Sequence, residues 1–62
     1  GAPPLYPETE EAQKLKDSLY DWINAGVLTG GYLKKAEIHM WNNDTAGMSN
    51  TIAWCQQQKK TA

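Results

Sequence analysis

The chain has only one cysteine, Cys55, and one histidine, His39, among its 62 residues. An internal disulfide is therefore impossible, and two soft ligands do not complete a structural zinc site, which usually needs four. A domain of this size buries only about 60% of the surface that its unfolded chain exposes. The fold must therefore be stabilised by the packing of apolar side chains, to which the three tryptophans bring the largest area each.

The residues after Pro7 have the pattern of an amphipathic helix, which we expect over about residues 8–25. Thr9 is a suitable N-cap, and the glutamates around it favour the positive end of the helix dipole. Gly26 is placed to end the helix in a left-handed conformation. The apolar residues recur at i, i+3, i+4 and i+7 and predict one buried stripe. These residues are Ala12, Leu15, Leu19, Trp22 and Ile23.

A second helix is expected over about residues 32–42, after a linker whose apolar residues Val27 and Leu28 should pack inward. Leu33, Ala36 and Met40 lie on one helical face. The segment 36–41 also alternates like a strand. We favour the helix because an isolated strand has no visible partner with which to form a sheet.

The run Asn42-Asn43-Asp44-Thr45 is typical of a turn, because these side chains bond their own backbone. A third helix should follow over about residues 45–59, capped by Asp44, Thr45 or Ser49. Its apolar stripe is predicted to consist of Met48, Ile52 and Cys55.

These elements predict an all-α fold, a small three-helix bundle formed by residues 8–60 as one domain. Residues 1–7 contain all three prolines and should form an extended, Pro-rich leader. The formal net charge of -1 argues against a dedicated nucleic-acid domain, which usually has a basic face. We expect no membrane span, and the lack of a signal peptide and of disulfides favours a soluble, intracellular chain.

The sequence contains no convincing catalytic constellation, so we expect no enzyme, cofactor or metal. Cys55 lies on an apolar stripe and is interpreted as a buried structural thiol rather than a nucleophile. His39 falls off the stripe of its helix and is interpreted as a solvated surface residue, with a ligand or a pH switch as alternatives.

Several large apolar residues miss the predicted stripes. At about 100° per residue, Tyr20 points roughly 140° away from Leu15 on the same helix. Such residues either widen the core or form an exposed patch of the kind found at protein-binding hot spots. The candidate partner-binding residues are Tyr20, Tyr32, Ile38, Trp41 and Trp54.

The main functional hypothesis is a non-enzymatic protein-interaction module that buries a peptide or helix of another protein against these side chains. The alternative is a structural or assembly segment of a larger protein or complex. A weaker alternative is a nucleic-acid-binding helical domain that uses the six lysines, but seven acidic residues offset them.

Residues Val27 to Gln57, with Met48, Ile52, Ala53 and Trp54 in the last helix, resemble ubiquitin-associated domains. The resemblance implies a three-helix fold and makes ubiquitin one candidate partner. Those domains bind ubiquitin through an apolar-Gly-aromatic loop that has no clear match here, and the first helix of this chain is longer. We therefore assign no family from the sequence.

Overall fold

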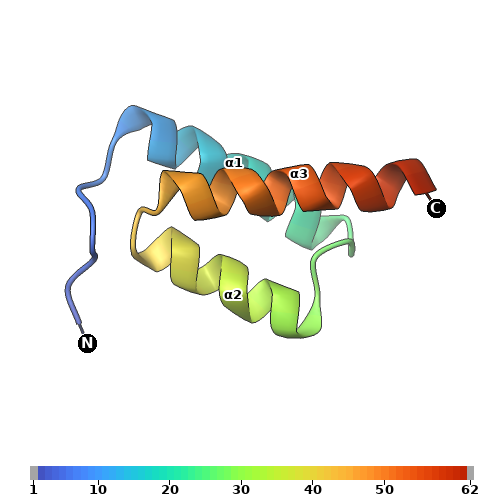
Figure 1. Ribbon diagram of the computed structural model, residues 1–62, viewed down its shortest axis with the longest axis horizontal. Coiled ribbons are helices and arrows are strands. Elements are labelled where there is room, and N and C mark those ends of the chain that lie inside the picture. Colours follow the sequence, from blue (N-terminus) through green and yellow to red (C-terminus); the bar gives the residue numbers. More distant parts are fainter. Residues whose placement is uncertain (1, 62) are drawn as a thin grey trace.

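The computed structural model describes residues 2–61, with the last of these described by its backbone alone. This part of the chain forms three helices and no strand, namely α1 (Glu10–Asn24), α2 (Gly30–Trp41) and α3 (Thr45–Thr61) (Figure 1). The predicted all-helical fold with three helices is therefore confirmed. The predicted helix ends differ from the observed ones by at most two residues, and the segment 36–41 is helical.

The core lies where the three predicted stripes meet. Leu15, Trp22 and Ile23 pack against it from α1, and Leu33 and Ile52 do so from α2 and α3. Helix α3 packs closely on both other helices, whereas α1 and α2 have the fewest contacts with each other. The buried core of the described residues consists of Ala12, Leu19, Leu28, Ala36, Met40, Met48 and Cys55.

Helix α1 begins and ends as its sequence predicts. The Thr9 side chain accepts a hydrogen bond from the Ala12 amide at 3.1 Å. Gly26 has a φ of 78°, and its amide donates to the Ile23 carbonyl at 3.1 Å. The Val27 amide donates to the Trp22 carbonyl at 3.2 Å, which completes a Schellman motif.

The corner between α2 and α3 has the same construction, with an asparagine in the left-handed position. Asn43 has a φ of 56°, and the Asp44 amide donates to the His39 carbonyl at 2.9 Å. The Asp44 side chain caps α3, since Oδ1 accepts from the Gly47 amide at 3.0 Å. The corner therefore ends one helix and starts the next within three residues.

His39 is less solvated than the sequence predicts. Its ring is half-buried, and Nδ1 lies 3.3 Å from Oδ2 of Asp44. A Cβ on Gly47 would lie 2.5 Å from Nδ1 of His39, so the absence of a side chain at Gly47 makes room for this contact. The stripe pattern alone missed the contact because it depends on how two helices meet.

The residues before α1 are bound to the same corner through their backbone. The Tyr6 amide donates to the Asn42 carbonyl at 3.1 Å, and the Tyr6 carbonyl accepts from Nδ2 of Asn43 at 3.0 Å. The side chains of Leu5 and Tyr6 are nevertheless exposed. Gly1 lies outside the described residues, and the extended shape of the whole leader, residues 1–7, stays a prediction.

We expect Asp44→Ala to lower the free energy of unfolding by about 1 kcal/mol, because α3 loses its N-cap. Asp44→Asn should cost less, since an amide oxygen still accepts the hydrogen bond from Gly47. Urea denaturation followed by circular dichroism measures both values, with the exposed Asp17→Ala as the control. A stability of Asp44→Ala equal to that of the control would show that the cap is dispensable.

Burial raises the pKa of the Cys55 thiol above its ordinary value, since desolvation disfavours the thiolate. At a pH well below the ordinary pKa of a thiol, both the folded and the unfolded chain keep the proton on Cys55. The thiol then does not contribute to the pH dependence of stability. Above that pKa the unfolded chain releases the proton while the folded chain keeps it. The free energy of unfolding must then fall as the pH rises.

Between about pH 7 and about pH 10 we expect the wild-type chain to lose more stability than Cys55→Ala. The difference should grow as the pH rises above the ordinary thiol pKa, and its slope cannot exceed about 1.4 kcal/mol per pH unit. Urea denaturation across this range measures it, and the variant cancels the contribution of lysines and tyrosines. Equal losses in the two proteins would mean that the thiol ionises as readily in the folded chain.

Candidate functional site

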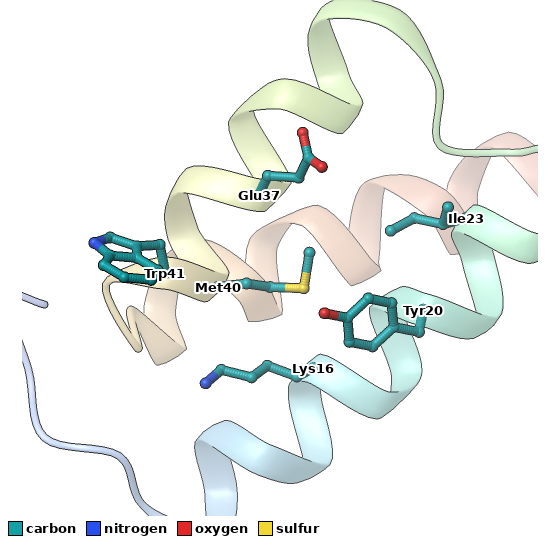
Figure 2. A pocket seen from close by; sticks show the side chains of 6 residues that line it. All are labelled: Lys16, Tyr20, Ile23, Glu37, Met40 and Trp41. Atoms are coloured by element: carbon teal, nitrogen blue, oxygen red, sulfur yellow. The ribbon is translucent and has the colours of Figure 1, made fainter. Parts of the chain in front are cut away.

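A hollow of about 330 Å³ lies between α1 and α2, where the bundle is packed least closely. Tyr20 and Trp41 stand on its two sides, and each is more than half exposed. Figure 2 shows that the lining side chains come from both α1 and α2. The lining residues are Lys16, Tyr20, Ile23, Glu37, Met40 and Trp41.

A second hollow continues from the first across the outer side of α2. It shares Glu37 and Trp41 with the first and adds Lys34 and Ile38. Ile38 is 59% exposed and Trp41 61% exposed. We call the two hollows together the α1–α2 face. The structure thus brings three of the predicted binding residues, Tyr20, Ile38 and Trp41, to one face.

The other two predicted residues form a pair of their own. The rings of Tyr32 and Trp54 stack with centroids 4.4 Å apart and an angle of 17° between their planes. Trp54 is half-buried and packs against the core, whereas Tyr32 is exposed. Trp54 also lines a separate hollow on α3 with Val27, Gln58 and Lys59. This pair joins the start of α2 to α3 and does not belong to the α1–α2 face.

The Trp41 ring is oriented by a contact distant in sequence. Its Nε1 donates to the Ala2 carbonyl at 3.0 Å. The hydrogen bond fixes the edge of the indole while most of the side chain stays exposed. Sequence reasoning missed it because 39 positions separate the two residues and Ala2 has no side chain that signals a partner.

Charged side chains surround the apolar part of the α1–α2 face. Lys16 is mostly covered, and its Nζ lies 3.6 Å from Oε2 of Glu8. Lys34 and Glu37 have opposite charges, and neither forms an ion pair within residues 2–61. Both are therefore available to a binding partner. The sequence analysis considered Lys34 only among the six lysines of the nucleic-acid alternative and did not select Glu37, although their spacing of three positions places them on the same side of one helix.

The groups that can support metal chemistry do not gather at this face. Within the described residues, no group of three or more His, Cys, Asp or Glu side chains is placed to hold a metal ion. Cys55 is buried in the core, and His39 contacts Asp44 at the α2–α3 corner. None of the helices in the described part of the chain is long and apolar enough to cross a membrane.

We expect Trp54→Ala to lower the free energy of unfolding by about 2 kcal/mol, because full burial of a tryptophan is worth about 3–5 kcal/mol and Trp54 is half-buried. Trp41→Ala is the matched control and should cost less than about 1 kcal/mol, since Trp41 is mainly exposed. Urea denaturation gives both values. Equal losses would contradict the expectation that the half-buried Trp54 contributes more to stability than the exposed Trp41.

Comparison with known proteins does not identify the chain, since no family model, no curated protein and no solved structure matches it. Its function is therefore inferred from the exposed side chains and hollows described above. The α1–α2 face is the part of the described surface where most of the predicted binding residues gather.

Proposed function

We propose that the chain is a non-enzymatic protein-interaction module and that its α1–α2 face binds an apolar helix or peptide of a partner. The observation that carries this proposal is the convergence of Tyr20, Ile38 and Trp41, each more than half exposed, around two adjoining hollows. Single exposed apolar residues are normal on a protein surface. A contiguous group rimmed by charges is typical of an interaction site.

The first hollow supports the insertion of a partner side chain. Ile23 and Met40 line it. Ile23 packs against the core, and Met40 belongs to the core. An inserted apolar side chain would therefore gain contacts with a well-packed floor between the Tyr20 and Trp41 rings. Aromatic side chains in such positions dominate the energy of many protein interfaces.

The hydrogen bond from Trp41 to Ala2 supports the same proposal because it lowers the entropy that the Trp41 side chain loses on binding. Ordering a free side chain on binding costs about 0.5–1.5 kcal/mol. An indole that is already fixed at its edge has less freedom to lose. The partner then meets a surface that is partly organised in advance.

A helix fits the site better than an extended strand. The described residues contain no strand, so no sheet edge is available for main-chain pairing. A groove between two helices suits an amphipathic helix with anchors at i, i+3 or i+4, and i+7. Lys34 and Glu37 would set the direction of that helix, because charges at a rim determine orientation more than affinity.

Selection of peptides from a random 16-residue phage library tests the proposal. We expect wild-type protein to enrich peptides with apolar residues at helical spacing, and Tyr20→Ala and Trp41→Ala each to weaken their binding by about 30-fold, as for hot-spot residues. Tyr6→Ala is the matched control, since Tyr6 is 53% exposed and Tyr20 54%, and Tyr6 does not line either hollow of the face.

Fluorescence titration with the enriched peptides measures these affinities, and circular dichroism verifies that each variant is folded. Two results would contradict the proposal. One is the absence of any enriched peptide, and the other is equal affinity for wild type and for the Tyr20 and Trp41 variants.

A further inference from the structure

One outward row of α2 is unusual in its order along the helix. Gly30, Lys34, Glu37 and Trp41 follow one another at spacings of four, three and four residues, which places them on one side of the helix. Ile38 adjoins the row. We call these five residues the α2 row. Its first half has no side chain at Gly30 and carries the positive charge of Lys34. Its second half carries the negative charge of Glu37 and the large ring of Trp41.

The glycine end of the row is open. A Cβ placed on Gly30 or on Gly31 would meet no heavy atom within 4 Å. The other end carries the indole of Trp41, 61% exposed. The row therefore carries a large side chain at one end and no side chain at the other, so that an approaching indole meets no steric obstacle at Gly30.

The charges of the α2 row are complementary to those of a second α2 helix that runs in the opposite direction. Lys34 and Glu37 form no ion pair within the described part of the chain. In an antiparallel pair of α2 helices, Lys34 of each copy lies opposite Glu37 of the other. The same alignment places Trp41 of each copy opposite Gly30 of the other, because both pairs are centred between Lys35 and Ala36. A single register thus satisfies charge and shape together.

We propose that a second copy of this chain binds to the α2 row, with the two α2 helices antiparallel about a twofold axis. The inference deepens the proposed function, on which it rests, by naming the partner of one part of the α1–α2 face. A twofold axis repeats each contact, so two ion pairs and two Trp41–glycine contacts form at once. Ile38 of each copy lies beside the aliphatic stem of Lys34 of the other and is covered.

The dimer is expected to be weak. The interface comprises one helix from each copy, which is at the small end of specific interfaces. We expect a dissociation constant above about 1 µM, so association should be visible between about 10 µM and 1 mM.

Sedimentation equilibrium tests this arrangement on the full chain and on two variants that each reverse one charge. Wild type should dimerise with increasing concentration. Lys34→Glu alone places two acids opposite each other, and Glu37→Lys alone places two lysines opposite each other, so each variant should dimerise at least about 10-fold more weakly. A 1:1 mixture of the two variants should recover wild-type association, because the mixed dimer again contains two opposite-charge pairs.

Lys59→Glu is the control for net charge, since Lys59 is exposed and lies on α3. It should dimerise like wild type, and circular dichroism should give the same helix content for all variants. The proposal is overturned if wild type is monomeric up to about 1 mM, if the mixture stays as weak as the single variants, or if Lys59→Glu weakens association equally.

The outcomes also separate this inference from the proposed function. A monomeric wild-type chain whose selected peptides still depend on Tyr20 would contradict only the second copy as partner. A dimer that recovers in the mixed sample, from a chain that enriches no peptide, would support the second copy and contradict the binding of other helices.

Discussion

The arrangement of this fold depends on α3, the helix on which both of the others pack. Met48 and Cys55 of α3 are fully buried, and Gly47 has no side chain, which lets α3 approach the ring of His39. Because α1 and α2 both use their apolar stripes against α3, little is left to close the edge between them. The hollow lined by Tyr20 and Trp41 lies at that edge. The candidate site is thus a consequence of how three helices share one small core.

The corner between α2 and α3 connects this core to the residues before α1. Asn43 takes the left-handed conformation that asparagine tolerates better than most residues, and its Nδ2 donates to the Tyr6 carbonyl. Glycine would suit the backbone there but would lose the bond to Tyr6. Asn43 therefore both forms the turn and hydrogen-bonds the residues before α1.

Features that depend on neighbouring residues could be predicted from the sequence. The cap at Thr9 and the left-handed end at Gly26 were predicted, and the cap at Asp44 was one of three candidates, because each follows from local hydrogen bonds. Angular position placed Tyr20 off the apolar stripe but left open whether it widened the core, and the structure shows that it is exposed. Local patterns describe each helix by itself, so they predicted the element ends to within two residues and the stripes that pack on the core.

Contacts between elements could not be predicted in the same way. Trp54 lies off the apolar stripe of α3, which indicated that it is less buried than Met48. The pattern did not indicate that the Tyr32 ring stacks on it. The contact of His39 with Asp44 was missed for the same reason, since it requires the chain to reverse at Asn43. Lys34 and Glu37 were not selected as protein-binding residues, because charged residues on a helix usually face water. Their importance depends on the hollow beside them.

Trp41 lies where these features meet, since it lines both hollows of the α1–α2 face and also donates to the Ala2 carbonyl. The donor is at the edge of the ring, and the faces of the ring are the part that an apolar partner contacts. A partner that covers a ring face therefore leaves the bond to Ala2 intact and benefits from the fixed orientation. A partner that needs the indole N–H must first break that bond, which disfavours polar ligands at this position. The residues before α1 thus contribute to the specificity of the proposed site without lining it.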